Sequence, residues 1–302
     1  MQEAKSVWTI IKILDWTKQY FQSKGVESPR LDAEVLLCDV LHCSRLHLYT
    51  SFDQPLQEEE LKKYRAYVAR RVKKEPVAYI LGSKGFMNAT FKVTKDTLIP
   101  RPETELLVEK LLSLKSFQEG PREILDIGCG SGIIVISLLL GLPQARGLAV
   151  DINPGAVAVT LDNARALGVG DRCAGLVSDL FEHVLPDDKF DLIVSNPPYI
   201  PQAVIPTLAP EVQQEPRAAL DGGVDGLDFY RKILTGAAEH LLPEGLIALE
   251  IGIEQGKAVE AICRAAGFAV VVVCRDYAGI DRMVFATREG TQYADEIMAL
   301  NK

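Results

Sequence analysis

The sequence predicts an α/β protein with a doubly wound, mostly parallel sheet of seven strands, preceded by a small helical bundle. Two observations predict this fold. From residue 122 onward, short apolar runs alternate with helical patterns, which is typical of a parallel sheet covered on both faces. Before residue 80, the apolar residues instead recur with the period of an α-helix.

Three helices are expected before residue 80. The second begins at Ser28-Pro29, because serine is a favoured N-cap and proline suits the first helical position. The apolar stripes expected to face the core are Val7, Ile10, Ile11, Leu14, Tyr20 and Phe21 in the first helix, and Leu31, Val35, Leu36 and Leu41 in the second.

The third helix, from about Glu58 to Lys74, is rich in cations. Such a cluster either docks an acidic partner or forms a solvated helix face, and the solvated face is the favoured interpretation. The cations are Lys62, Lys63, Arg65, Arg70, Arg71, Lys73 and Lys74.

Four segments are expected along the chain: a helical domain at residues 1–84, a β-hairpin linker at 85–100, an α/β domain at 101–288 and a loosely held tail at 289–302. Phe91, Val93 and residues 97–99 indicate the hairpin. In the α/β domain, a helix is expected at Pro154–Leu167. The expected strands are Glu123–Ile127, Gly147–Asp151, Ala174–Ser178, Phe190–Ser195, Leu246–Ile251, Ala269–Cys274 and Arg282–Thr287.

Composition excludes several classes of protein. The 33 Lys+Arg and 41 Asp+Glu give a net charge of −8, whereas a protein that wraps duplex nucleic acid needs an excess of cations. The longest apolar stretch, Ile133–Leu142, is too short to span a bilayer, and residues 1–5 lead into no secretory signal. The six cysteines and four histidines do not cluster, so reduced thiols without a metal are expected. We therefore expect a cytoplasmic protein with no membrane partner.

A glycine-rich turn follows the first strand, in the sequence Ile-Leu-Asp-Ile-Gly-Cys-Gly-Ser-Gly at residues 124–132. Its third glycine comes one place too early for the dinucleotide-binding motif. Asp151 ends the second strand 19 residues after Gly132, where an acid can accept hydrogen bonds from both ribose hydroxyls of a nucleoside. The alternative is that Asp151 only caps the helix entered through Asn153-Pro154.

The third strand closes with Asp179-Leu180. An acid at this position can accept from the exocyclic amine of an adenine, and Leu180 can pack against the ring. Cys129 has no histidine near it in sequence, so we expect a small loop residue rather than a nucleophile.

The fourth strand ends in Ser-Asn-Pro-Pro-Tyr at residues 195–199, at the edge where open α/β sheets bind ligands. Two prolines fix φ and remove two donors, which leaves the Asn196 side chain and the Pro197 carbonyl as acceptors. These acceptors suit an NH₂ group, on which Tyr199 can stack. Such a site orients the nitrogen toward an electrophilic methyl and needs no general base before transfer.

Asn-Pro-Pro-Tyr together with Asp-x-Gly-x-Gly resembles the class I S-adenosylmethionine-dependent amino-methyltransferases, which modify DNA adenine, ribosomal RNA or protein glutamine. Other segments, in matching order between about residues 30 and 287, resemble the bacterial peptide chain release factor N5-glutamine methyltransferase family. These segments are residues 76–82, 98–108, 215–220 and 275–282.

This resemblance implies methyl transfer from S-adenosyl-L-methionine to the glutamine of the Gly-Gly-Gln motif in class 1 release factors, with S-adenosyl-L-homocysteine as the product. A monomer without a direct nucleic-acid partner is expected, and residues 1–84 are expected to recognise the release factor. Residues 100–104 would form a loop over the site without an assigned role. Carried over by motif, the cofactor residues are Gly128, Cys129, Gly130, Ser131, Gly132, Asp151, Leu180 and Asn196, the substrate residues are Asn196, Pro197, Pro198 and Tyr199, and the catalytic residues are Asn196, Pro197 and Tyr199. At Leu180 some relatives carry an aromatic residue.

Two alternatives remain open from the sequence. An adenine N6-methyltransferase would flip its base into the same turn, but the net charge of −8 disfavours a nucleic-acid substrate. A non-catalytic module that binds S-adenosylmethionine or a dinucleotide would have no use for the intact turn at residues 196–199.

Overall fold

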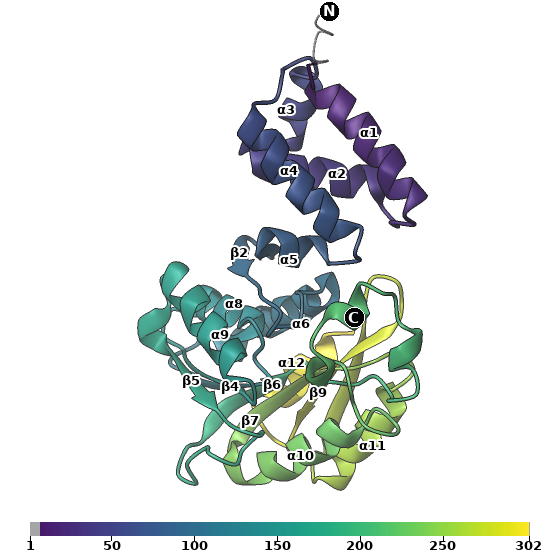
Figure 1. Ribbon diagram of the computed structural model, residues 1–302. Coiled ribbons are helices and arrows are strands. Elements are labelled where there is room, and N and C mark those ends of the chain that lie inside the picture. Colours follow the sequence, from purple (N-terminus) through teal and green to yellow (C-terminus); the bar gives the residue numbers. More distant parts are fainter. Residues whose placement is uncertain (1–6, 302) are drawn as a thin grey trace, which may run out of the picture. The chain divides into compact units, whose positions relative to one another are not determined.

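The computed structural model describes residues 7–301 of the chain (Figure 1). The chain divides into two compact units, of which the first comprises residues up to Gly82 with Pro210–Gln214, and the second comprises Ser83–Ala209 with the residues from Glu215 onward. Residues 1–5, on which the expectation about a secretory signal rests, lie outside the described part. No helix between residues 7 and 301 combines the length and apolar character that a bilayer span requires.

The first unit is helical, as expected, but its described residues form five helices where three were predicted, because two short helices, α3 (Arg45–Thr50) and α5 (Val77–Leu81), were not expected. Its core contains the fully buried Phe21, Leu36 and Leu37, together with Tyr64, whose hydroxyl donates to the Ala33 carbonyl at 3.0 Å. Its helices are α1 (Ile10–Ser23), α2 (Pro29–Leu41), α3 (Arg45–Thr50), α4 (Glu58–Arg71) and α5 (Val77–Leu81).

The predicted apolar stripes of α1 and α2 are partly wrong. Ile11 is 44% exposed and Leu31 is 46% exposed, and Val7 is also exposed. The buried faces carry Thr17 in α1 and Leu37 in α2 instead. Both helices have more apolar residues than one face can hold, so the helical period alone does not identify the buried stripe.

Helix α4 ends at Arg71 rather than at the predicted Lys74, and most of the cations between residues 62 and 74 have acidic partners within the chain. Arg71 is only 5% exposed and pairs with Asp32 at 2.7 Å and Glu211 at 3.0 Å. The contact with Glu211 joins residues 210–214 to the helical unit. Lys62, Lys63, Arg70 and Lys74 also lie within ion-pair distance of carboxylates. These pairs leave little unneutralised charge to dock an acidic partner.

A β-hairpin opens the second unit, but it lies earlier than predicted. Its strands are β1 (Ser83–Phe86) and β2 (Ala89–Lys92), joined in antiparallel register. Residues 97–99 form no strand, because the backbone N–H of Ile99 donates to the Glu215 carboxylate at 2.9 Å rather than to a neighbouring strand.

The predicted seven-stranded sheet is confirmed, with the order β5-β4-β3-β6-β7-β9-β8. All neighbouring strands are parallel except that β9 runs antiparallel to both β7 and β8. The strand order reverses at β3, where such sheets open a crevice for ligands. The strands are β3 (Glu123–Ile127), β4 (Arg146–Asp151), β5 (Cys173–Val177), β6 (Phe190–Ser195), β7 (Leu241–Glu250), β8 (Val270–Arg275) and β9 (Asp281–Thr287).

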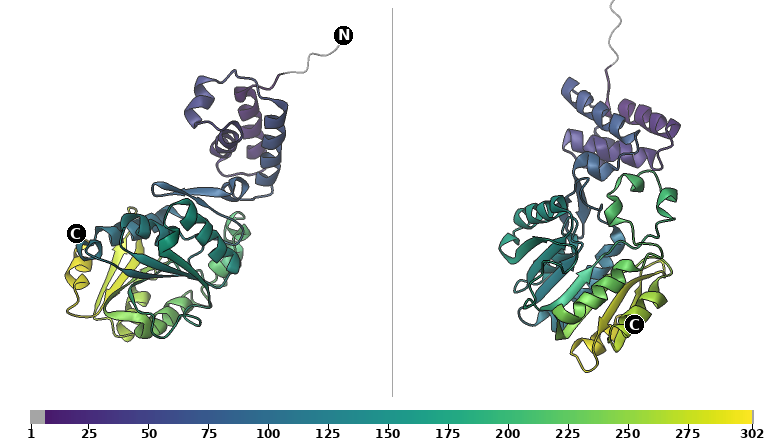
Figure 2. Two further views of the ribbon diagram at one scale, coloured as in Figure 1. Left: turned by 90° about the vertical axis from the view of Figure 1, so that its left-hand side faces the viewer. Right: turned by 60° about the horizontal axis from the view of Figure 1, so that its bottom comes forward.

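Helices cover both faces of the sheet, as the near-continuous apolar strands require (Figure 2). Successive strand residues face opposite cores: Ile124 belongs to the core that also contains residues of α6, α8 and α12, whereas Leu125 belongs to the core that contains residues of α10 and α11. The helices of this unit are α6 (Pro102–Ser113), α7 (Lys115–Gln118), α8 (Ile133–Gly141), α9 (Pro154–Ala166), α10 (Asp228–His240), α11 (Gly256–Ala265) and α12 (Tyr293–Ala299).

The prediction of a loose tail at residues 289–302 is wrong. Tyr293 and Ile297 of α12 are fully buried in the core, and the Tyr293 ring lies 5.7 Å from that of Phe117. The Glu296 carboxylate accepts from the hydroxyl of Ser116 at 2.7 Å. Tyr293 and Ile297 are four residues apart, which is the spacing of apolar residues on one buried face of a helix. This spacing could have predicted a packed helix instead of a tail.

Candidate active site

A cavity of about 290 Å³ lies at the carboxyl ends of β3, β4, β5 and β6. The predicted residues Asp151, Leu180 and Asn196 line it, as do Gly128–Ser131 and Pro197-Pro198. It is therefore in the crevice where a doubly wound sheet binds its ligand. Two predicted residues, Gly132 and Tyr199, do not line this cavity.

The glycine loop between β3 and α8 depends on its glycines for two different reasons. Gly128 and Gly130 have φ values of +72° and +56°, and a Cβ on either would point into open space, where a ligand can approach the backbone. Gly132 has φ of +79°, and a Cβ there would come within 2.8 Å of Ile136 and Thr160. Gly132 thus allows the loop to pack closely on α8 and α9.

Asp151 ends β4 and supports the loop. Its Oδ2 accepts from the Gly130 N–H at 3.0 Å, and its Oδ1 accepts from the Asn153 N–H at 2.9 Å. Burial raises the pKa of Asp151, and the backbone donors oppose that shift. The N-cap of α9 is Asn153, whose side chain accepts from the Gly155 N–H at 2.8 Å, so Asp151 does not cap this helix.

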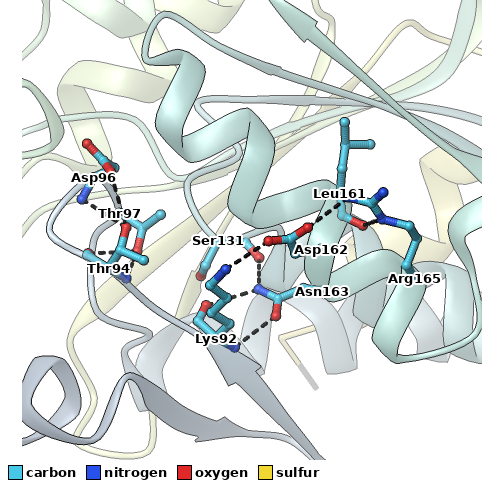
Figure 3. Close-up of polar contacts among 9 residues, drawn as sticks. All are labelled: Lys92, Thr94, Asp96, Thr97, Ser131, Leu161, Asp162, Asn163 and Arg165. Atoms are coloured by element: carbon cyan, nitrogen blue, oxygen red, sulfur yellow. Dashed lines mark hydrogen bonds and ion pairs between the residues drawn. The ribbon is translucent and has the colours of Figure 1, made fainter.

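Helix α9 holds the other side of the loop. The side chain of Asn163 donates to the Ser131 carbonyl at 2.8 Å and exchanges hydrogen bonds with both backbone groups of Lys92, as Figure 3 shows. The Thr160 hydroxyl donates to the Gly130 carbonyl at 3.1 Å. Cys129 is buried beside it, and burial raises the pKa of its thiol well above the usual value, which does not suit a nucleophile.

The Asn196–Tyr199 turn, called the clamp below, is fixed to the end of β6. Ser195 Oγ donates to the Ile127 carbonyl at 2.6 Å and so ties β6 to β3. Asn196 Nδ2 donates to Thr104 Oγ1 at 3.2 Å. This contact uses the nitrogen end of the Asn196 amide and leaves the oxygen end for a donor.

Behind the clamp lies a buried carboxyl that the sequence analysis missed. Thr104 Oγ1 donates to Glu250 Oε2 at 2.6 Å, and Glu250 is only 2% exposed. Burial raises the pKa of Glu250 to about 7, although the Thr104 hydroxyl, the charge of Arg282 and the Asn196 side chain act in the opposite direction. Thr104 lines the cavity, whereas Glu250 does not. An acid within the otherwise apolar segment 246–251 was the available signal.

Tyr199 lies with its ring against the neighbouring strand end. A Cβ on Gly252 would come within 3.0 Å of ring atom Cδ2, and the Tyr199 carbonyl accepts from Gln255 Nε2 at 3.0 Å. Burial raises the pKa of the Tyr199 phenol to about 12. Stacking of this ring on a substrate stays a prediction.

The Pro100–Thr104 loop joins two walls of the cavity. The Glu215 carboxylate pairs with Arg101 and also accepts from the Ile99 N–H. Helix α6 begins at Pro102 and carries Thr104 in its first turn. The loop therefore places Thr104 within hydrogen-bond distance of Asn196, and this role of the loop was not predicted from the sequence.

The charge of the cavity wall is negative. Four carboxylates line it, from Asp96, Asp151, Asp179 and Asp221, against the two cations Arg101 and Lys232. Such a wall favours a ligand with net positive charge. Among the described residues there is no group of three His, Cys, Asp or Glu side chains that could hold a metal ion.

Comparisons with known proteins agree with this site. Residues 12–82 match the model of the PrmC N-terminal domain, and residues 102–257 match that of the methyltransferase small domain. The release factor glutamine methyltransferase of Geobacter sulfurreducens is 47% identical over 287 residues, which cover 94% of this chain and 98% of that protein. The same enzyme of Caulobacter vibrioides is 41% identical, covering 93% and 96%.

A solved structure with a similar fold is the 16S rRNA N2 G1207 methyltransferase RsmC of T. thermophilus, in complex with AdoMet and guanosine. It has a TM-score of 0.50 and 20% identity over 68% of this chain and 50% of that one. At this identity the likeness shows the fold alone. The extent and identity of the curated relatives, with both domain models, show that this chain belongs to the release factor glutamine methyltransferase family.

Proposed function

We propose that the chain transfers a methyl group from S-adenosyl-L-methionine to the side-chain amide nitrogen of the Gly-Gly-Gln glutamine in class 1 release factors, and that Asn196 and Pro197 hold that amide. The observation that carries the assignment of these residues is the position of Asn196. It lines the cavity, and its Nδ2 already donates to Thr104, so that Oδ1 is the end available to an NH₂ group.

The cavity residues fit S-adenosyl-L-methionine. Gly128 and Gly130 allow close approach to the loop backbone, and each oxygen of the Asp151 carboxylate accepts one backbone N–H and keeps a lone pair for a ribose hydroxyl. The four lining carboxylates suit the net positive charge of this cofactor. When bound, the cofactor supplies an electrophilic methyl group on a positively charged sulfur.

The protein contributes orientation and acceptors. An amide nitrogen is a weak nucleophile because its lone pair is delocalised, so it must be turned to face the methyl group. Asn196 Oδ1 and the Pro197 carbonyl each accept one N–H and fix the plane of the amide, and both oxygens stabilise the positive charge that grows on nitrogen. Pro197 and Pro198 have no N–H that would compete for the acceptors. The N–H becomes acidic only as the nitrogen–methyl bond forms and the methyl–sulfur bond breaks with its electron pair left on sulfur, so the proton is lost afterwards to solvent water.

The helical domain at residues 1–84 is proposed to recognise the release factor, with residues 85–100 as linker and 101–288 as the catalytic domain. The clamp contacts a single side chain and therefore offers too little surface to choose one glutamine in a protein. Additional contact area has to come from another part of the chain, and the helical domain is a separate compact unit that can provide it.

The test is a single-turnover assay with labelled cofactor, a purified release factor and, separately, bulk nucleic acid, followed by mapping of the label. Asn196→Ala should lose roughly 10²–10³ in rate, as on removal of one oxyanion-hole donor, and leave cofactor binding nearly intact. Asn196→Asp should keep partial activity because it retains an acceptor. Asn88→Ala, an exposed asparagine in the hairpin turn, serves as the control. A wild-type rate for Asn196→Ala would refute the clamp, and label on nucleic acid would refute the substrate.

A further inference from the structure

The hydrogen-bond chain from Glu250 through Thr104 to Asn196 has a direction. The Thr104 hydroxyl donates its single hydrogen to Glu250 Oε2 at 2.6 Å. In its ionised form Glu250 can only accept hydrogen bonds, so that form holds the Thr104 hydrogen in this direction. With this hydrogen used, Thr104 Oγ1 can only accept further hydrogen bonds. Its second partner must therefore be a donor, and that donor is Nδ2 of Asn196. The Asn196 amide is thereby fixed with its oxygen toward the cavity.

This direction matters because the two ends of an amide have nearly the same shape. If the Asn196 side chain were flipped, its NH₂ would face the NH₂ of the substrate and the two groups would not bond. The flipped side chain would instead donate to the carbonyl oxygen of the substrate amide. The glutamine would still bind, but with its nitrogen turned away from the position of the methyl group.

We propose that Thr104 and Glu250 are positioning residues that select the reactive orientation of the substrate amide, because they determine which end of Asn196 faces the cavity. The proposal rests on the proposed function and adds to it the source of selectivity for an NH₂ donor. It also distinguishes glutamine from glutamate, since the carboxylate of glutamate has no hydrogen to donate to Asn196 Oδ1.

The location of Glu250 supports a role that acts through Asn196. Ser195 of β6 is paired with Leu249 of β7, so Asn196 and Glu250 are the next residues of two adjacent parallel strands. Glu250 is outside the cavity wall and thus has no contact with a ligand there. A buried carboxyl is costly, and a neutral side chain would fill the same space at a lower cost in stability. The orientation of Asn196 accounts for retaining the acid.

The test uses the full chain and an intact release factor, with kcat, KM and cofactor Kd measured for Thr104→Val, Thr104→Ser and Glu250→Gln. Loss of one hydrogen bond that holds the amide should lower kcat about tenfold in Thr104→Val, with KM equal or lower because the flipped amide still binds. Thr104→Ser should restore kcat. In Glu250→Gln, the new NH₂ can donate to Thr104 Oγ1. The Thr104 hydroxyl can then donate to Asn196 Oδ1, which reverses the Asn196 amide so that its NH₂ faces the cavity.

A second measurement separates orientation from general loosening of the site. A release factor with glutamate in place of the glutamine should inhibit the wild type poorly. The ratio of the inhibition constant of this glutamate-containing release factor to the KM of the normal one should fall about tenfold in Glu250→Gln, because Asn196 can then present its NH₂ to the carboxylate. A merely structural role would weaken both ligands together. Thr287→Val, which removes a buried hydroxyl at the end of β9 outside the cavity, is the matched control.

The outcomes are distinguishable. If Asn196→Ala is inactive but Glu250→Gln and Thr104→Val retain wild-type kcat and wild-type discrimination against glutamate, the orientation proposal is wrong and the proposed function stands. If Asn196→Ala is itself fully active, the proposed function is wrong. Glu250→Gln has the same shape as the native residue, so it carries the test if Thr104→Val does not fold.

Discussion

Replacement of Asp151 by alanine should weaken the binding of S-adenosyl-L-methionine by roughly 30- to 700-fold. Each carboxylate oxygen accepts one backbone N–H, from Gly130 at 3.0 Å or Asn153 at 2.9 Å, and keeps a lone pair for one ribose hydroxyl. Two hydrogen bonds to a charged group contribute about 3–6 kcal/mol together, and water in the vacated space offsets part of this. A net loss of about 2–4 kcal/mol corresponds to the stated range, at about 1.4 kcal/mol for each tenfold change.

The same substitution also removes one anchor of the glycine loop, at the Gly130 N–H, and one of the turn before α9, at the Asn153 N–H, and these contributions must be separated. Thr160→Val removes the contacts of the Thr160 hydroxyl with the Gly130 carbonyl and with Cys129 Sγ, both in the loop, so it measures how much the loop support matters without removing the Asp151 carboxylate. Asp171→Asn, at an exposed aspartate outside the cavity, controls for the loss of charge.

The assay is isothermal titration with the cofactor and with its 3′-deoxy analogue. The wild type should bind the analogue more weakly than the cofactor, because one hydrogen bond to Asp151 is missing. In Asp151→Ala the two ligands should bind equally. An unchanged cofactor Kd in Asp151→Ala, or the same discrimination against the analogue as in the wild type, would show that Asp151 does not hold the ribose.

Two further predictions concern stability and domain roles. Burial raises the pKa of Asp126 to about 7, so its contribution lowers stability progressively as the pH rises from the unfolded value near 3.8 to about 7, and the loss is complete above that pH. Asp126→Asn should therefore raise Tm relative to the wild type at pH 8, by a margin that shrinks as the pH falls toward 4, and a pH-independent difference in thermal melts would contradict this. A chain that begins at Ser83 should keep its cofactor Kd but lose at least about tenfold in kcat/KM on the intact release factor, and full kcat/KM would argue against recognition by the helical domain.

The positions of the strands and of the main site residues were predictable because parallel sheets follow strong local rules. An apolar strand followed by a glycine turn or a proline turn marks a carboxyl end, and in a parallel sheet these ends meet at one edge. Asp151, Leu180 and Asn196 come from three different strands, yet this rule brings all three to one cavity. At these positions the rule for parallel sheets was enough to predict which residues from distant parts of the sequence lie together.

The features that were missed depend on contacts between distant segments. Thr104 belongs to α6 and meets Glu250 across 146 residues of sequence, which no local pattern indicates. The hairpin was placed too late because residues 97–99 have the composition of a strand, whereas their backbone bonds to Glu215 instead. The stripes of α1 and α2 were ambiguous because the tertiary packing, and not the period, selects the buried face.

One local pattern nevertheless occurs twice, and its second occurrence was available from the sequence. Leu125-Asp126-Ile127-Gly128 ends β3, and Leu249-Glu250-Ile251-Gly252 follows the same order at the end of β7. Both strands neighbour β6, which lies between them and carries the clamp. Each acid is buried, and burial raises the pKa of each to about 7.

Burying a carboxyl destabilises the fold in both cases, and each of the two acids accepts a hydrogen bond from a segment next to the cavity. Asp126 accepts from the Val135 N–H at 3.2 Å and so fixes the start of α8 behind the glycine loop. Glu250 accepts from Thr104 and so fixes Asn196 in the clamp. Neither acid lines the cavity, and each acts on a segment that does. A buried acid one residue before Ile-Gly at a parallel strand end therefore indicates where a loop must be held in one orientation, on the cofactor side in the first case and on the substrate side in the second.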